Sequence, residues 1–328
     1  MRKLKRLLMV IFDMFFDIVL LPVNTITIFW LKRARKRRFK YQYVTKKVLF
    51  KIGVFPIIDH YYEPLFNTKY LYKSLREDRN IPAIDFNIKE QLDLISKFTY
   101  QSELLSFPRK KTTNNFEFSY DYGAYPSGDS EIYYSMIRLI KPKRIIEIGS
   151  GSSTLMALNA IKFNKYEDKS YECELICIEP YEYDWLEELG IEVIRQRVER
   201  TDLSLFKSLD ENDILFIDSS HIIRPQGDVL YEILEILPTL KKLVYVHFHD
   251  ICTPKDYFDE WVLNQVFWNE QYLLEAFLSF NKDFKIVLAS NYLFHHYKDI
   301  LLDKCPILKE DLLNNPKRET GSFWIQRV

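Results

Sequence analysis

Seven short apolar runs alternate with longer stretches of helical periodicity in the second half of the chain. The runs cover residues 144–148, 175–179, 192–195, 214–218, 243–248, 284–289 and 322–328. Apolar runs of this length, separated by stretches in which apolar residues recur every three or four positions, are typical of strands alternating with helices. The pattern predicts an α/β fold with a doubly wound, seven-stranded sheet, and the last two runs are expected to form an antiparallel edge.

The segment before this pattern, residues 40–122, has a different character. It is rich in aromatic residues and poor in glycine, and residues 90–98 show a helical period. We expect a mostly helical N-terminal extension or lid in this segment. The α/β domain is then expected to occupy residues 123–328.

Residues 7–31 form the longest apolar stretch, which is long enough to span a membrane. Asp13 and Asp17 lie one helical turn apart within it, and Pro22 interrupts its second half. Lysines and arginines flank both ends, and the positive-inside rule would keep both ends on the cytoplasmic side. These features favour a broken, interfacial or re-entrant helix on anionic lipid. A true span and a soluble helix packed on a partner are the alternatives.

The charge distribution separates this leader from the rest of the chain. Residues 1–51 contain 14 lysines and arginines against only Asp13 and Asp17, although the whole chain has a net charge of zero. A basic leader suits an anionic surface, whereas an acidic body gives no electrostatic case for binding nucleic acid. We therefore expect a cytoplasmic protein that associates with the inner face of the membrane through residues 1–39.

The first predicted strand ends in a short glycine-containing loop, Glu147-Ile148-Gly149-Ser150-Gly151, and a helical run follows at residues 155–161. Glycines at such a corner let the backbone approach a nucleotide-type ligand, to which the helix N-terminus presents free N–H groups. The third glycine of the dinucleotide fingerprint would fall at Thr154, so that fingerprint is incomplete. The loop therefore indicates a nucleotide-type cofactor and counts against a dinucleotide.

Ionisable residues stand at the ends of three further strands. Glu179 ends the second strand, where a carboxylate can accept both hydroxyl groups of a ribose. Asp218 and His221 follow the fourth strand, and His249 and Asp250 follow the fifth. Because ligands of open α/β sheets bind at the carboxyl ends of the strands, we expect these four side chains to share one pocket.

Two chemistries suit this pocket. In the first, His221 or His249 acts as a general base toward a substrate hydroxyl, since histidine titrates near neutral pH. In the second, Asp218, His249 and Asp250 bind a divalent cation such as Mg²⁺, which lowers the pKa of the hydroxyl and orients it. A purely structural role is the third alternative.

These motifs resemble those of bacterial class I S-adenosylmethionine-dependent methyltransferases with an IDxSH and HDI pattern. The resemblance covers residues 123–328 and rests on residues 145–154, 178–182, 216–221, 227–228, 249–251 and 268–274. It implies a Rossmann-like fold and S-adenosylmethionine as the cofactor. The segment around Asp129 resembles one that closes over the cofactor in this family. The expected cofactor-binding residues are Glu147, Gly149, Ser150, Gly151, Glu179, Glu199, Asp218 and Asp129.

The resemblance also implies a reaction, because such enzymes are linked to O-methylation of surface glycans and small molecules. We expect the sulfonium methyl group to pass to a hydroxyl of a small-molecule or glycan acceptor at the membrane, with His221, His249 and Asp250 as catalytic residues. The aromatic N-terminal extension, with Tyr133, Tyr134 and the loop after Asp250, is expected to form the acceptor wall. The alternatives are a nicotinamide-dependent sugar oxidoreductase and a membrane-tethered scaffold without catalytic activity.

Overall fold

The computed structural model describes residues 2–59, 64–114, 116–122, 125–181 and 183–328, with the side chains of residues 2–5 and 7 excepted. Its contacts divide the chain into two units, Met1–Lys73 and Ser74–Val328. The division falls inside the segment 40–122 that the sequence analysis treats as one extension. The expected domain start at residue 123 and the motif residue Glu182 lie outside the described residues.

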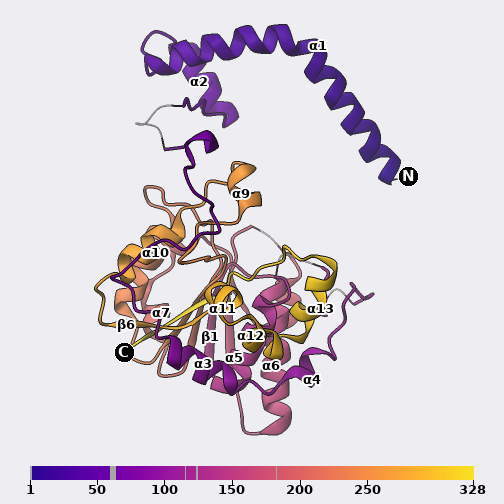
Figure 1. The fold of residues 1–328 in the computed structure, drawn as a ribbon, viewed down its shortest axis with the longest axis vertical. Helices are drawn as coiled ribbons and strands as arrows, with labels where there is room; N and C mark the ends of the chain where they lie inside the picture. Colours follow the sequence, from indigo (N-terminus) through magenta and orange to yellow (C-terminus); the bar gives the residue numbers. More distant parts are fainter. Residues whose placement is uncertain (1, 60–63, 115, 123–124, 182) are drawn as a thin grey trace. The chain divides into compact units, whose positions relative to one another are not determined.

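The N-terminal unit contains helices α1 (Arg2–Lys36) and α2 (Tyr43–Ile52) and the short 3-10 helix η1 (Thr68–Tyr70). Helix α1 continues through Pro22, and Figure 1 shows that it bends part way along its length. A proline removes one helical hydrogen bond and often kinks a helix without ending it. The predicted break is therefore a bend within one helix. By length and composition, Leu8–Lys36 could cross a membrane, and its most apolar window is not buried in the structure.

The larger unit is built on a seven-stranded sheet. Its strands are β1 (Arg144–Ile148), β2 (Glu174–Ile178), β3 (Glu192–Ile194), β4 (Ile214–Ile217), β5 (Tyr245–Phe248), β6 (Phe284–Ala289) and β7 (Phe323–Arg327). The strand order is β3-β2-β1-β4-β5-β7-β6. The first five strands are parallel, and β7 pairs antiparallel with both β5 and β6. The doubly wound sheet and the antiparallel final pair are confirmed. The structure shows that β7 lies between β5 and β6, so β6 is the edge strand.

Helices cover both faces of the sheet (Figure 1). One apolar cluster joins the sheet to α3 (Ile88–Ser96), α4 (Gln101–Leu104), α5 (Asp129–Ile140), α6 (Ser152–Glu167), α11 (Ser290–His296), α12 (Lys298–Lys304) and α13 (Pro306–Asn314). The other joins it to η3 (Val198–Arg200), α7 (Leu203–Lys207), α8 (Asp228–Tyr231), η4 (Glu232–Ile236), η5 (Leu237–Thr239) and α10 (Glu270–Leu278). Side chains alternate along a strand, so Ile145 packs in the first cluster and Ile146 in the second. Both faces of the sheet are therefore buried, as expected for a largely parallel sheet.

Two smaller elements complete the unit, η2 (Leu186–Leu189) after β2 and α9 (Asp259–Leu263) after β5. A third, small apolar cluster lies beside α9 and contains Leu75, Cys252, Tyr257 and Val262. It joins the first residues of the larger unit to the loop that follows β5. This loop also carries the polar residues described next.

Candidate functional site

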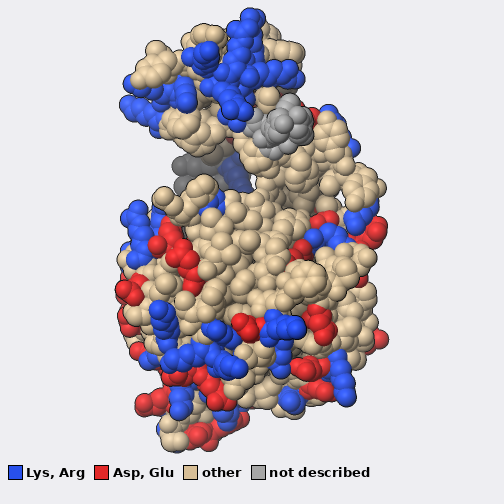
Figure 2. Space-filling view, turned by 90° about the vertical axis from the view of Figure 1, so that its left-hand side faces the viewer, with Lys and Arg blue, Asp and Glu red and all other residues tan. Residues whose placement is uncertain are grey.

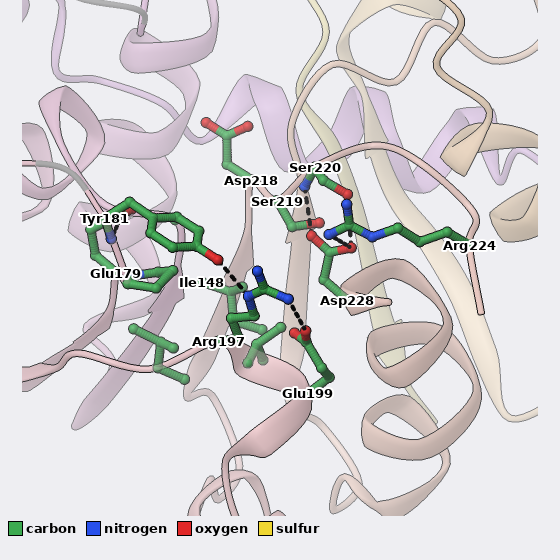
Figure 3. Close-up of a pocket in the computed structure, with 14 residues that line it drawn as sticks. Ile148, Glu179, Tyr181, Arg197, Glu199, Asp218, Ser219, Ser220, Arg224 and Asp228 are labelled. Atoms are coloured by element: carbon green, nitrogen blue, oxygen red, sulfur yellow. Dashed lines mark hydrogen bonds and ion pairs between the residues drawn. The ribbon is translucent and has the colours of Figure 1, made fainter. Parts of the chain in front are cut away.

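Two neighbouring cavities lie at the carboxyl ends of β1, β2 and β4. In this sheet β1 separates β2 from β4, so the connections on its two sides diverge and leave a crevice between them. The larger cavity, of about 350 Å³, extends from Glu179 to Asp228 (Figure 3), and the smaller, of about 270 Å³, lies over the loop at residues 149–153. Both cavities are lined by Gly149, Glu179, Asp218 and Ser219.

The loop after β1 depends on the absence of a side chain at Gly149. Its φ is +77°, and a Cβ there would overlap the carbonyl oxygen of Asp218. The N–H of Asp218 donates to the carbonyl of Ile148 over 2.8 Å, so the ends of β1 and β4 meet at this point. A Cβ at Gly151 would lie 2.9 Å from the ring of Tyr183. The first glycine therefore permits the close approach of two strand ends, and the second leaves space beside an aromatic ring.

Glu147 lies beneath this loop and does not line either cavity. Its carboxylate is fully buried, where it accepts hydrogen bonds from Thr154 over 2.5 Å and from Tyr133 over 3.0 Å. Thr154 also accepts the N–H of Gly151, so Glu147 supports the loop indirectly. Its placement differs from the predicted cofactor contact because alternate residues of β1 face opposite sides of the sheet, and Glu147 faces the layer of α5 and α6. Burial raises the pKa of Glu147 to about 7, against these hydrogen bonds.

The predicted carboxylates Glu179 and Glu199 do line the larger cavity. Glu179 is buried at the end of β2, where it accepts the N–H of Tyr181 over 2.8 Å. Glu199 lies 3.9 Å from Arg197, which also donates a hydrogen bond to the hydroxyl of Tyr181 (Figure 3). The cavity wall thus carries both predicted carboxylates, and Arg197 lies beside Glu199.

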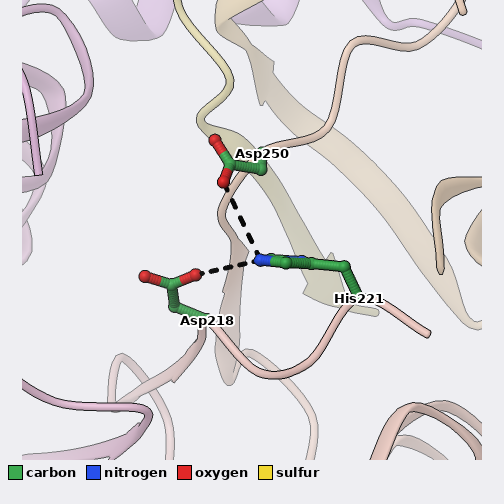
Figure 4. Close-up of side chains that lie close together, drawn as sticks. All are labelled: Asp218, His221 and Asp250. Carbon is green, nitrogen blue, oxygen red and sulfur yellow. Dashed lines mark ion pairs between the residues drawn. The ribbon is translucent and has the colours of Figure 1, made fainter. Parts of the chain in front are cut away.

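Four residues from the ends of β4 and β5 form a cluster beside the cavities, which we call the Asp/His cluster: Asp218, His221, His249 and Asp250. Nε2 of His221 lies 3.3 Å from Asp218 and 3.8 Å from Asp250 (Figure 4). Nδ1 of His249 lies 3.4 Å from Asp218 and 3.5 Å from Asp250. Each imidazole therefore faces both carboxylates, as the strand-end pattern predicts.

The backbone is strained at two of these positions. His221 has a φ of +59° and Asp250 a φ of +60°, in the left-handed region that residues with a side chain seldom adopt. Such conformations cost roughly 1–3 kcal/mol each and persist only where the surrounding structure holds them. The fold thus maintains two strained residues at the point where their side chains converge.

Charge couples the four residues strongly. Burial alone would lower the pKa of His221 and of His249, but the carboxylates that they face raise both pKa values well above the usual range. Burial would raise the pKa of Asp218, yet the charge of His249 and a hydrogen bond to His221 lower it. Burial raises the pKa of Asp250 to about 6. Because a protonated imidazole cannot accept a proton, the predicted base role requires another positive charge that neutralises the carboxylates.

The cluster has donor atoms that suit a cation. Asp218, His221 and Asp250 each direct one ligand atom into a group whose members lie within 4.8 Å of one another (Figure 4). Both ring nitrogens of His249 are buried without a hydrogen-bond partner, although buried polar atoms normally have one. The sequence analysis chose His249 as the third ligand, whereas the structure places His221 in the group and His249 beside both carboxylates.

Three other predicted residues belong to α5 and are buried. Asp129 is buried at the start of α5, where it accepts the N–H groups of Gly321 and Ser322 and lies 3.5 Å from Nε2 of His249. It does not line either cavity. Tyr133 and Tyr134 are fully buried, so they do not form an acceptor wall. Tyr133 packs on Phe216, His247 and Trp324 of the sheet. Tyr134 packs on Phe107 and Phe163 and donates a hydrogen bond to Glu103.

Sequence reasoning assigned no role to Glu270, which contacts His221. Its Oε2 lies 2.7 Å from Nδ1 of that ring, and its side chain is almost completely buried. The residue belongs to the motif at 268–274, but it is distant in sequence from the strand ends. The sequence does offer one indication of Glu270. It is an acidic residue that begins a helical run and has apolar residues nearby on both sides of it in the sequence.

Comparisons with known proteins agree with this fold. The model of a methyltransferase domain matches residues 146–251, which run from β1 past the Asp/His cluster. An uncharacterised protein of Archaeoglobus fulgidus is 34% identical over 168 residues, which are 47% of this chain and 74% of that protein.

Two solved structures of O-methyltransferases are more distant. The enzyme TomG of Streptomyces achromogenes, involved in tomaymycin synthesis and solved with S-adenosylmethionine, has 12% identity and a TM-score of 0.36, over 72% of this chain and 89% of that one. An O-methyltransferase of Bacillus cereus, solved with S-adenosylhomocysteine, has 10% identity and a TM-score of 0.30, over 73% of this chain and 90% of that one. The domain match, the archaeal relative and the order of the strands together support one family. From these we conclude that the chain belongs to the class I S-adenosylmethionine-dependent methyltransferases.

Proposed function

We propose that the protein transfers the methyl group of S-adenosylmethionine to a hydroxyl group of a sugar-type acceptor. The observation that carries this proposal is the Asp/His cluster, which borders the cofactor cavities through Asp218. A hydroxyl oxygen must attack the methyl carbon while the carbon–sulfur bond breaks, and its proton must pass to the protein or to water. The cluster would provide carboxylates that orient a polyol and imidazoles that can accept a proton once a cation offsets the carboxylates.

The cofactor is proposed to lie across both cavities. Glu179 and Glu199 line the larger cavity and would accept hydrogen bonds from the adenosine part. The loop at residues 149–153 lines the smaller cavity and would bind the methionine part. Asp218 belongs to both walls, so the sulfonium methyl would lie near the Asp/His cluster. Alignment of this methyl group with the hydroxyl supplies most of the catalysis, because the cofactor is already activated.

A divalent cation completes the proposed site. Asp218, His221 and Asp250 would hold it, and when bound it would lower the pKa of the acceptor hydroxyl. A site that includes imidazole suits Mn²⁺, Fe²⁺ or Zn²⁺ as well as Mg²⁺, which prefers oxygen ligands. Nδ1 of His249 faces Asp218 and Asp250, so we expect His249 to accept the hydroxyl proton once a cation offsets the charge of these two carboxylates.

The proposed place of this reaction is the cytoplasmic face of a membrane. The support comes from α1, whose long apolar stretch is followed by a segment rich in lysine and arginine at residues 32–40. Lysines and arginines beside an apolar helix are attracted to anionic lipid. A lipid-linked or membrane-associated glycan acceptor would suit this arrangement.

Methyl transfer from labelled S-adenosylmethionine tests the proposal. The purified full-length protein is incubated with nucleotide sugars, lipid-linked sugars, catechols and amines, with a chelator and after restoration of single metal ions. We expect label on a sugar hydroxyl, loss of transfer with chelator, and recovery with one metal ion. Transfer to an amine would contradict O-methylation. Tight binding of S-adenosylhomocysteine without transfer to any acceptor would favour the scaffold alternative.

A further inference from the structure

The segment that begins α10 holds His221 through three kinds of contact. Oε2 of Glu270 lies 2.7 Å from Nδ1 of the imidazole, and the Glu270 side chain is only 1% exposed. The carbonyl oxygen of His221 accepts the N–H groups of Asn269 over 3.0 Å and of Glu270 over 3.2 Å. The indole of Trp268 packs on the imidazole with ring centroids 4.3 Å apart. Side chain, backbone and ring contacts together hold a residue whose φ is unfavourable by itself.

These contacts give the two ring nitrogens different surroundings. Nδ1 faces Glu270, whereas Nε2 faces Asp218 and Asp250. When the ring is neutral, its proton lies on the nitrogen with the closer carboxylate contact, because a carboxylate accepts hydrogen bonds and cannot donate one. That nitrogen is Nδ1, since Glu270 lies at 2.7 Å whereas Asp218 and Asp250 lie 3.3 Å and 3.8 Å from Nε2. The lone pair then remains on Nε2, on the side of the cluster. Nε2 is the atom that a cation or an acceptor proton would meet.

Glu232 is a second buried carboxyl group near this pair. Its Oε2 accepts a hydrogen bond from the hydroxyl of Ser219 over 3.0 Å. Burial, followed by the negative charge of Glu270, raises the pKa of Glu232 well above its usual value. The carboxyl groups in contact with His221 are Asp218 and Asp250 on the Nε2 side and Glu270 on the Nδ1 side.

We propose that Glu270 is the positioning residue of His221, which fixes the proton of the neutral ring on Nδ1 and directs the lone pair of Nε2 toward Asp218 and Asp250. This inference rests on the proposed function of the Asp/His cluster. Glu270 acts through His221, since the side chain lines neither cavity. Carboxylates that orient a histidine in this way typically change metal affinity or activity 10–100-fold when they are removed.

The substitution Glu270→Gln removes the fixed acceptor with little change in size. A glutamine can present either its carbonyl or its NH₂ group to Nδ1, so the neutral ring is free to carry its proton on either nitrogen. We expect kcat to fall roughly 10–100-fold, while the KM for S-adenosylmethionine and the affinity for S-adenosylhomocysteine stay within about twofold. The affinity for Zn²⁺, measured by calorimetry without cofactor or acceptor, should fall by a similar factor to kcat.

The control is Glu275→Gln on the same helix. Glu275 is also buried and bonds to Arg79 and Thr253, but it has no contact with His221. This variant should lose stability without a change in kcat or in Zn²⁺ affinity. The conservative variant Glu270→Asp keeps the carboxylate, so it should recover part of the kcat and part of the Zn²⁺ affinity that Glu270→Gln loses.

The tautomer itself can be observed in the unaltered protein by ¹⁵N NMR of the His221 ring, assigned by its loss in His221→Gln. Spectra recorded with Zn²⁺, and from pH 6 to 10 without it, should show the proton on Nδ1 once the ring is neutral or bound. A proton on Nε2 overturns the proposal, even if Glu270→Gln does not fold. Unchanged kcat and Zn²⁺ affinity in a folded Glu270→Gln variant would also overturn it. If no acceptor is ever methylated, the NMR and Zn²⁺ measurements still decide the role of Glu270.

Discussion

Helices α1 and α5 are both rich in apolar residues, yet their side chains have opposite surroundings. In α1 most of the described large apolar side chains are exposed, and its lysines and arginines gather at its two ends. In α5, ten of twelve residues are buried, among them Asp129, Glu131 and Arg138. Burying a charge is costly unless it is paired and hydrogen-bonded, so α5 must obtain partners from elsewhere in the fold.

The partners of α5 come from distant parts of the chain. Glu131 accepts the backbone N–H groups of Gly128, Ile307 and Leu308 over 2.8–3.0 Å. Arg138 pairs with Glu103 over 2.8 Å and with Glu167. The comparison shows that apolar content does not distinguish the two helices. What distinguishes them is burial, because α5 packs its apolar and charged side chains inside the fold whereas most large apolar side chains of α1 are exposed.

The surface charge repeats this contrast. Figure 2 shows lysines and arginines gathered on the N-terminal unit with few acidic residues among them. On the larger unit the same view shows basic and acidic residues intermixed, as expected for an ordinary solvated surface. If the contrast reflects function, changes in the larger unit should affect catalysis or stability, and changes in the N-terminal unit should affect membrane binding alone.

The largest effect is expected from Asp218→Asn. Asp218 lines both cavities and faces both imidazoles, so loss of its charge removes a proposed cation ligand and the partner of two bases. We expect methyl transfer to fall about a thousandfold, within the range for loss of acid–base groups. Asp210→Asn is the control, because Asp210 is exposed and pairs with Lys241 at the surface. Activity of Asp218→Asn within threefold of the unaltered protein would contradict the site.

A large loss of stability is expected from Gly149→Ala. The added Cβ overlaps the carbonyl oxygen of Asp218, and neither strand end can move freely. We expect the free energy of unfolding to fall by about 3 kcal/mol or more, as for other substitutions at strained backbone positions. Gly190→Ala is the matched control, since Gly190 has a φ of +71° but open space around it. It should cost about 1 kcal/mol, the price of the left-handed conformation alone. The free energy of unfolding is measured in urea. Equal losses in the two variants would contradict the close approach of Gly149 to the carbonyl oxygen of Asp218.

Much of this fold could be predicted from the sequence because the strands are buried on both faces. The apolar runs at residues 144–148 and 284–289 coincide with β1 and β6, and the other predicted strands differ from the observed ones by one or two residues at their ends. The Asp/His cluster could be predicted for the same reason, since parallel strands bring their carboxyl ends to one edge. The same pattern of apolar runs therefore predicts both the strands and the edge of the sheet at which the cluster lies.

The supporting residues could not be predicted in this way. Glu270 meets His221 only because α10 begins beside the loop after β4, a contact between positions 49 residues apart. The position of Glu147 next to the loop suggests a place in the pocket wall, whereas the alternation of side chains along β1 turns it toward α5 and α6. Residue types reveal what chemistry is present, but three-dimensional packing decides which side chain supports another.

The smallest effect is expected from Lys36→Ala in the N-terminal unit. Lys36 is exposed at the end of α1, among the basic residues that follow its apolar stretch. A single lysine near an anionic membrane surface contributes about 1 kcal/mol, so binding to vesicles that contain phosphatidylserine should weaken roughly fivefold. The difference should shrink in 0.5 M salt, because added ions screen exposed charges.

Lys282→Ala, which removes an exposed lysine from the larger unit, is the control and should bind as the unaltered protein does. An equal loss in both variants would mean that overall charge, and not the leader, governs membrane binding. Methyl transfer to a soluble acceptor should be the same in all three proteins, which separates the function of the leader from that of the Asp/His cluster.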